Sequence, residues 1–171
     1  MEKAALAVMR LQPLHNGHKL LIDAMLSEAA IALVGVGSIN KNDRRNPFSF
    51  ADRKAMIEAL YKDEPRLKVF GLRDIEANSK REWADFVLGE IKRQGLPNPT
   101  RYYAGDRKNG EWFSEVLPIR IVDRLKEGGG ISSTELRQAF SGESANLPIP
   151  DEIKDFLRNR DEFQRFFSQS I

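Results

Sequence analysis

The chain of 171 residues contains no cysteine and only two histidines. The absence of cysteine excludes a disulfide scaffold, a zinc–thiolate site, an iron–sulfur cluster and a cysteine nucleophile. With two histidines, a zinc site built from scattered imidazoles is impossible, and a Ser–His–Asp triad would have to recruit one of that pair. Any catalytic or binding site in this chain therefore uses no thiol and at most two imidazoles.

Long apolar runs are also missing, because none approaches the ~20 residues that cross a bilayer. The first nine residues contain a short apolar stretch, without the longer apolar region and the cleavage site of a signal peptide. We therefore expect a soluble, cytoplasmic protein with no membrane partner.

Charge of one sign is not in excess, since 27 Lys and Arg against 25 Asp and Glu leave a formal net charge of +2. A dedicated nucleic-acid binder usually carries a basic stripe, whereas here the two signs interleave. We expect no nucleic-acid partner. A binder that uses the basic patch at 41–45 is the least favoured alternative.

Short apolar runs alternate with amphipathic stretches along the whole chain, which has the length of one domain. Repeated strand–helix–strand units predict a Rossmann-like α/β fold, a doubly wound parallel sheet followed by C-terminal helices at about 150–171. Ser49 with Asp52, and Ser79 with Glu82, have the spacing of capping boxes. We expect strands at 6–9, 31–37, 67–72, 101–104 and 119–122, and helices at 17–30, 49–61, 79–94, 110–116, 133–140 and 151–167.

Both histidines follow the first predicted strand, and in such sheets ligands bind at the carboxyl ends of the strands. His15 and His18 flank Gly17, which allows close approach of the backbone to a ligand. The free N–H groups of the next helix form an anion site, and two imidazoles can donate to phosphate oxygens. The alternative is a pair of surface or capping histidines. Chelation of a metal by this pair is disfavoured because no carboxylate is near.

Two further segments follow predicted strands. Glycines at 129–130 precede three hydroxyl residues at a helix start, and Arg137 lies one turn inside. Hydroxyls and a guanidinium in this order can bind phosphate, although an ordinary loop with an N-cap remains open. Gly35 and Gly37 end the second strand, and Arg53 lies on the first turn of the next helix. Taken alone, Arg53 is better interpreted as an exposed helix charge.

These segments together resemble a known family. Residues 10–18, with Ile131–Arg137, resemble the HxGH and ISxTxxR signatures of the nucleotidylyltransferase superfamily. Gly35–Ser38 and Asn46–Phe48 narrow the resemblance to the archaeal-type nicotinamide-nucleotide adenylyltransferases. The resemblance implies one nucleotidyltransferase domain over 1–171. It also implies adenylyl transfer from ATP to nicotinamide mononucleotide, which gives NAD and pyrophosphate.

The resemblance implies roles for individual residues. His15, His18 and Arg137 would be catalytic, with the histidines at the α-phosphorus and the arginine on the β- and γ-phosphates. Trp83 would stack on the nicotinamide ring, unless it packs into the core. Mg²⁺ would be held mainly by the ATP phosphates, without a protein metal site. Further ATP contacts are implied for Arg10, Gln12, Gly17, Arg53, Gly105, Asp106, Ser132, Ser133 and Thr134, and acceptor contacts for Gly35, Asn78 and Trp83.

The chain also departs from the family pattern, with Met9-Arg10-Leu11 in place of the usual Gly-Arg-Phe. The loop at Gly105–Gly110 is more basic than the family pattern, so the acceptor stays open: FMN, nicotinic acid mononucleotide and phosphopantetheine are alternatives to nicotinamide mononucleotide. A nucleotide-sensing module that binds without turnover is the alternative of a different class. The expected partners are ATP and a pyridine mononucleotide, and a homo-oligomer is possible.

Overall fold

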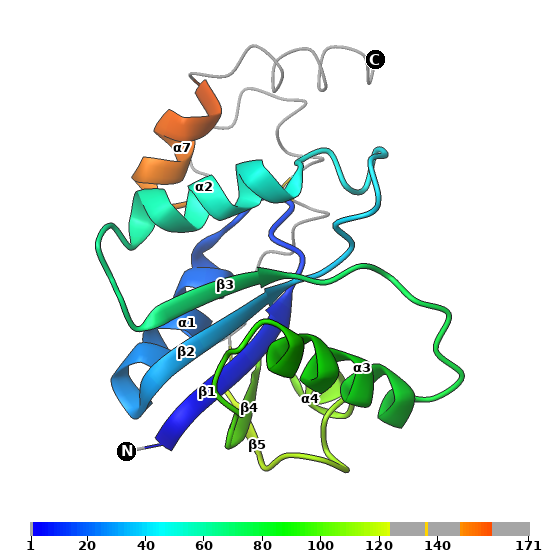
Figure 1. Ribbon diagram of the computed structural model, residues 1–171. Coiled ribbons are helices and arrows are strands. Elements are labelled where there is room, and N and C mark those ends of the chain that lie inside the picture. The colour runs from blue at the N-terminus through cyan, green and yellow to red at the C-terminus, as the bar shows by residue number, and fades with distance from the viewer. Residues whose placement is uncertain (1, 124–135, 137–147, 159–171) are drawn as a thin grey trace.

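The computed structural model describes residues 2–123, 136 and 148–158. Figure 1 shows a central sheet with helices on both faces. The elements in chain order are β1 (Glu2–Met9), α1 (Asn16–Glu28), β2 (Ala29–Val36), α2 (Phe50–Leu60), β3 (Leu67–Gly71), α3 (Lys80–Arg93), β4 (Arg101–Ala104), α4 (Arg107–Gly110), β5 (Ile119–Ile121) and α7 (Asp151–Arg158).

The sheet has five strands in the order β3-β2-β1-β4-β5, and every pairing between them is parallel. The chain runs outward from β1 through β2 to β3, then crosses back to β4 on the other side of β1. The strand order therefore reverses at β1, which makes its carboxyl end the switch point where ligands bind in such sheets. The predicted doubly wound parallel α/β sheet is confirmed.

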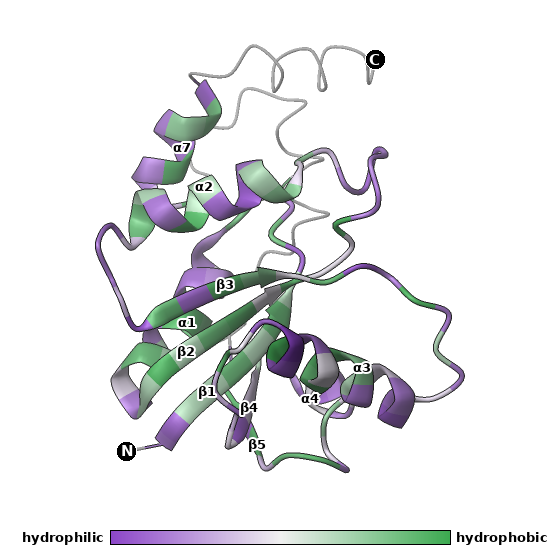
Figure 2. Cartoon of the chain, viewed as in Figure 1, coloured by the Kyte–Doolittle hydropathy of each residue, from purple (hydrophilic) through white to green (hydrophobic). Residues whose placement is uncertain are grey.

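Each face of the sheet supports its own apolar core, because successive side chains of β1 point to opposite faces. Ala5, Ala7 and Met9 lie in the core with α1, α2 and α7, while Ala4 and Leu6 lie in the core with α3. Figure 2 shows β1 and β2 as mostly hydrophobic and the helices as mixed, the pattern of strands covered on both faces. Among the described residues, no helix has the length and apolarity needed to span a membrane.

The prediction between β4 and β5 is wrong in position. A helix was expected at 110–116, but α4 occupies 107–110 and is followed by turns. The reason is Asp106, whose Oδ1 accepts a hydrogen bond from the Asn109 backbone at 2.7 Å and so starts the helix earlier. The predicted helix at 133–140 lies outside the described residues except for Leu136.

The two predicted capping boxes differ. Ser49 and Asp52 exchange contacts at the start of α2, with the Asp52 N–H donating to Ser49 Oγ and the Ser49 N–H donating to Asp52 Oδ2. Ser79 caps α3 by accepting from the Glu82 N–H at 3.0 Å. The Glu82 carboxylate instead accepts from the backbone and side chain of Asn78, so only half of the second box forms.

Candidate active site

The two histidines lie at the start of α1, where they cap the helix. His15 is the N-cap residue, and its Nδ1 accepts a hydrogen bond from the Gly17 N–H at 3.1 Å. The Nδ1 of His18 accepts from the His15 N–H at 3.3 Å. The two rings lie 3.7 Å apart between centroids, and both side chains are buried. The two imidazoles therefore accept the backbone hydrogen bonds that Ser and Glu side chains accept in an ordinary capping box.

This capping fixes the tautomer of both rings. Because each Nδ1 accepts a backbone N–H, we assign the proton of each neutral imidazole to Nε2. The Nε2–H donors of His15 and His18 thus lie beside the positive end of the α1 dipole, and His15 Nε2 is buried. Donors at a helix start suit phosphate oxygens, whereas a metal would need an unprotonated nitrogen. The capping and phosphate-binding interpretations of this pair are therefore compatible.

The turn that leads into α1 is held by Gln12. Its Nε2 donates to the Phe48 carbonyl and its Oε1 accepts from the Phe48 N–H, both at 2.9 Å. The amide thereby copies the pairing of a strand residue and joins this turn to the segment before α2. Leu11, just before it, adopts a positive φ of 53°, a conformation that surrounding contacts must stabilise. The ATP contact expected for Gln12 stays a prediction, while the geometry gives its side chain a positioning role.

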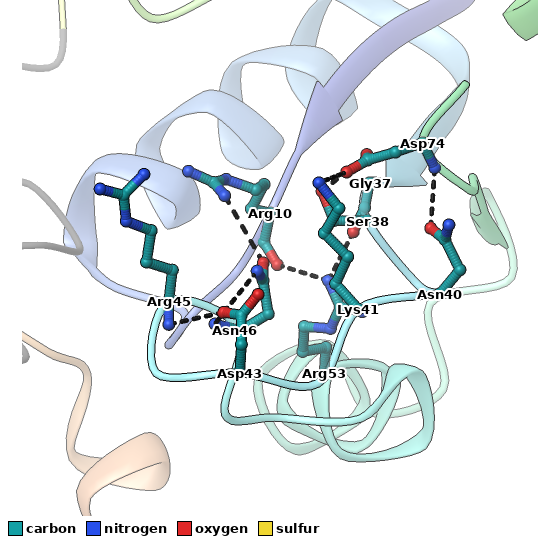
Figure 3. A network of polar contacts seen from close by, with 10 residues as sticks. All are labelled: Arg10, Gly37, Ser38, Asn40, Lys41, Asp43, Arg45, Asn46, Arg53 and Asp74. Carbon is teal, nitrogen blue, oxygen red and sulfur yellow. Dashed lines mark hydrogen bonds and ion pairs between the residues drawn. The ribbon is translucent and has the colours of Figure 1, made fainter. Parts of the chain in front are cut away.

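Arg53 lies beneath the carboxyl ends of β1 and β2, with an exposed fraction of 0%. Its Nη1 donates to the carbonyls of Arg10 at 2.9 Å and Gly37 at 2.6 Å (Figure 3). The interpretation as an exposed helix charge is wrong. Arg53 shares the inward face of α2 with Met56 and Ile57, three and four residues on, so helical periodicity could have found it. Burial, with the nearby charge of Arg10, lowers the pKa of Arg53 to about 10, so it stays cationic at neutral pH.

Arg10 is the exposed cation at the end of β1. Its Nη1 donates to Asn46 Oδ1 at 3.5 Å, the long end of the hydrogen-bond range. Asn46 is buried and in turn donates to Asp43 Oδ1, which also accepts from the Arg45 N–H (Figure 3). This turn therefore anchors the Arg10 guanidinium through Asn46.

A cavity of about 620 Å³ opens beside Arg10, within the size range of small-molecule sites. Trp83 and Trp112 both line it, and the Lys80–Glu111 ion pair at 2.6 Å joins α3 to the segment that carries Trp112. Trp83 also lies 5.5 Å from the ring of Phe86, so it packs partly on its own helix. The full lining is Val8, Arg10, Lys41, Asp74, Ile75, Ala77, Trp83, Tyr102, Asn109 and Trp112.

Of this lining, sequence reasoning predicted only Arg10 and Trp83 as site residues. Among those it missed, Lys41, Asp74 and Trp112 contribute charge or an indole ring to the cavity. Lys41 was visible only as part of the basic patch at 41–45, and no pattern in the sequence singled out Asp74. Trp112 carried one usable signal, since a large aromatic in a polar segment is unusual, and its exposed fraction is 42%. No local pattern indicates that these three side chains line one cavity.

Two predicted acceptor residues lie outside this lining. Gly35 is buried within β2, where an added Cβ would lie 2.7 Å from Leu72 Cδ1 and 3.1 Å from Phe70 Cζ. Its lack of a side chain therefore makes room for packing. Asn78 is exposed, and its N–H and Nδ2 both donate to Glu82 Oε2. Acceptor contacts for Gly35 and Asn78 stay predictions.

Of the remaining predicted ATP residues, those that the structure describes lie in two regions. Gly17 is buried at the start of α1, and Gly105 is buried just after β4. Asp106 caps α4, with Oδ2 accepting from Asn109 Nδ2 at 2.8 Å. The phosphate segment predicted at Ser132, Ser133, Thr134 and Arg137 lies outside the described residues.

Comparison with known proteins agrees with this geometry. The sequence matches the cytidylyltransferase-like family over residues 10–139. It is 39% identical over 159 residues to a nicotinamide-nucleotide adenylyltransferase of Thermococcus sibiricus, covering 90% of this chain and 82% of that protein. It is also 37% identical over 159 residues to the enzyme of the same name from Methanocorpusculum labreanum, covering 75% of this chain and 94% of that protein.

The fold also resembles a solved structure of a bifunctional NMN adenylyltransferase/ADP ribose pyrophosphatase from Francisella tularensis, with a TM-score of 0.76 at 21% identity. That alignment covers 99% of this chain and 54% of the other, so the chain spans about half the length of the bifunctional protein. The chain belongs to the cytidylyltransferase-like family and, within it, to the nicotinamide-nucleotide adenylyltransferases.

Proposed function

We propose that the chain transfers the adenylyl group of ATP to nicotinamide mononucleotide, giving NAD and pyrophosphate. The observation that carries the proposal is the place of Arg10. It lines the cavity that contains Trp83, and it directly precedes the turn that leads to the Nε2–H donors of His15 and His18. ATP and the nicotinamide mononucleotide that accepts its adenylyl group can therefore meet at one edge of the sheet.

The reaction needs positioning and charge stabilisation more than proton transfer. The acceptor phosphate is mostly a dianion at neutral pH, because its second pKa is about 6, and needs no general base. One of its oxygens attacks the α-phosphorus of ATP, the bond to the β-phosphate oxygen breaks, and pyrophosphate leaves with that electron pair. His15 and His18 donate to the α-phosphate oxygens as negative charge develops on them. Arg10 adds positive charge at the same edge, and Arg137 is expected to hold the β- and γ-phosphates.

The cavity suits the ring of the acceptor. The pyridinium of nicotinamide mononucleotide is planar and cationic, and tryptophan faces attract such rings by stacking and by cation–π interaction. Trp83 and Trp112 both line the cavity and supply two such faces. Relatives bearing the name nicotinamide-nucleotide adenylyltransferase support this acceptor.

A divalent cation is expected to accompany ATP. The solved Francisella protein was crystallised with AMP and a manganese ion. Among the described residues, no group of three or more carboxylates and imidazoles could hold a metal ion. The donors offered by the histidines and Arg10 fit phosphate oxygens, so we propose that Mg²⁺ is held through the nucleotide. When bound, it neutralises phosphate charge while retaining several waters. Homo-oligomer formation and a cytoplasmic location remain predictions from the sequence.

The test is pyrophosphate release from ATP and Mg²⁺ with four acceptors supplied separately: nicotinamide mononucleotide, nicotinic acid mononucleotide, FMN and phosphopantetheine. We expect turnover with nicotinamide mononucleotide. Turnover only with FMN or phosphopantetheine would keep the chemistry and reject the acceptor. ATP binding with no turnover on any acceptor would favour the nucleotide-sensing alternative.

A further inference from the structure

The segment after β2 is fastened to the segment after β3. The Ile39 N–H donates to the Leu72 carbonyl at 3.1 Å, and Asn40 Oδ1 accepts from the Asp74 N–H at 2.8 Å. Ser38 Oγ donates to Asp74 Oδ1 at 2.8 Å (Figure 3). These contacts join two neighbouring strand ends and fix the backbone from which Lys41 extends.

Lys41 and Asp74 meet at the lining of the cavity. The Nζ of Lys41 lies 2.8 Å from Asp74 Oδ2, and Figure 3 shows the lysine side chain reaching toward that carboxylate. Half of the Lys41 side chain remains exposed. An ammonium carries three N–H donors, so it can hold the carboxylate and a ligand oxygen together. Asp74 thereby restrains a side chain that is otherwise flexible.

The lining has two chemically different parts. Among its described residues, Arg10 and Lys41 are the two cations and Asp74 is the one anion. Arg10 and Lys41 follow β1 and β2, whereas Trp83 and Trp112 come from α3 and the turns after α4. A mononucleotide has the same division, with a phosphate at one end and a ring at the other. Its phosphate must lie toward the α-phosphorus of ATP, and hence toward the side where Arg10 precedes the histidines.

We propose that Lys41 binds the phosphate of the acceptor mononucleotide and that Asp74 is the positioning residue that holds its ammonium in place. The inference rests on the proposed function and adds to it the residue that recognises the acceptor phosphate. A carboxylate beside a phosphate would by itself oppose binding. Its benefit is that it keeps the lysine extended over the cavity.

The experiment compares two ligands that differ only in the phosphate: nicotinamide mononucleotide and nicotinamide riboside. Binding is followed by tryptophan fluorescence, because the two tryptophans of the chain, Trp83 and Trp112, both line the cavity. Lys41→Ala should weaken binding of the mononucleotide roughly 10- to 100-fold, the effect of a charge-assisted hydrogen bond. Binding of the riboside should stay within about twofold, because that ligand has no group for Lys41 to bind. Lys41→Arg should restore part of the loss.

Lys54→Ala is the matched control. Lys54 has the same side-chain exposure of 50% and an ion pair with Glu58, but it lies on α2 outside this cavity. It should change neither affinity. In turnover assays, Lys41→Ala should raise the KM for the mononucleotide and leave the KM for ATP unchanged.

Asp74→Asn separates positioning from repulsion. It keeps a polar partner for Ser38 and removes the charge that holds Lys41, so we expect weaker binding of the mononucleotide and unchanged binding of the riboside. Tighter binding would show that Asp74 only repels the phosphate. The role of Lys41 would be overturned if Lys41→Ala weakened binding of both ligands equally or of neither. The proposed function would still stand in that case, provided that the wild-type protein turns over nicotinamide mononucleotide. A wild-type protein that bound ATP but not the mononucleotide would overturn both.

Discussion

His18 caps α1, and we propose that it also donates to a reacting phosphate; replacing it by Asn or Gln distinguishes these two roles. Asn can offer Oδ1 where the imidazole has Nδ1, so it keeps an acceptor for the His15 N–H. Gln reaches further and can offer an N–H near the position of Nε2. Alanine offers neither. The three variants therefore divide the helix-capping contact from the phosphate donor.

The expected magnitudes differ between the two roles. The capping contact is long, at 3.3 Å, and loss of an N-terminal cap costs about 1 kcal/mol. In a domain of this size that cost lowers the Tm by about 2–4 °C. Loss of a donor to the reacting phosphate costs about 2.7–4 kcal/mol of transition-state stabilisation, or 100- to 1,000-fold in kcat. His18→Asn should thus melt close to wild type and turn over 100- to 1,000-fold more slowly.

The assay is steady-state pyrophosphate release, measured beside thermal unfolding followed by circular dichroism. His18→Ala should lose both stability and turnover, and His18→Gln should recover part of the turnover. Two results would refute the role of the His18 Nε2–H as a phosphate donor. One is near wild-type turnover in His18→Asn, and the other is equal turnover of the Asn and Gln variants when both are folded.

Three further predictions concern Arg53, Trp83 and Asp74. Arg53→Met should lower the free energy of unfolding by about 2–4 kcal/mol in urea titrations, because the carbonyls of Arg10 and Gly37 lose a charged donor. Lys54→Met is the exposed control, and equal stability of the two variants would contradict the role of Arg53. Trp83→Ala should raise the KM for nicotinamide mononucleotide by about tenfold with little change in the KM for ATP, since a stacking face is worth about 1–1.5 kcal/mol; an unchanged acceptor KM would leave Trp83 a packing residue. Although burial opposes ionisation, the Lys41 and Ser38 contacts lower the pKa of Asp74. Its contribution to stability is therefore complete above the unfolded pKa and is lost as the pH falls through the lower folded value. Urea midpoints from pH 6 to pH 2 should fall less steeply in Asp74→Asn than in wild type, and parallel curves would contradict the shift.

The sheet was predictable because its information is local. β1 and β2 are nearly continuous apolar runs, as parallel strands covered on both faces must be. Ser49 with Asp52 marks the start of α2 within four residues. The position of His15 and His18 after β1 could likewise be predicted from the chain order. The use of both imidazoles as caps could not, since it depends on which ring nitrogen faces the backbone.

The rest of the site depends on contacts between segments far apart in the chain. Gln12 pairs with Phe48 and Ser38 with Asp74, each across 36 residues. Neither periodicity nor capping rules describe such pairs, because both concern residues within about four positions of each other. The burial of Arg53 is the exception. Arg53 lies three and four residues before the core side chains Met56 and Ile57, so helical periodicity predicts that it faces inward. The general expectation that arginine is exposed led to the opposite prediction.

The bonds from Gln12 to Phe48, and from Arg53 to Arg10 and Gly37, have a consequence for the rate of substrate capture. They connect the ends of β1 and β2 to the start of α2 before any nucleotide arrives. The entropy lost in ordering this turn is therefore lost during folding and is not subtracted again from the affinity. Encounter with ATP at the start of α1 should then proceed without a slow rearrangement of the turn, as in other sites whose backbone barely moves on binding.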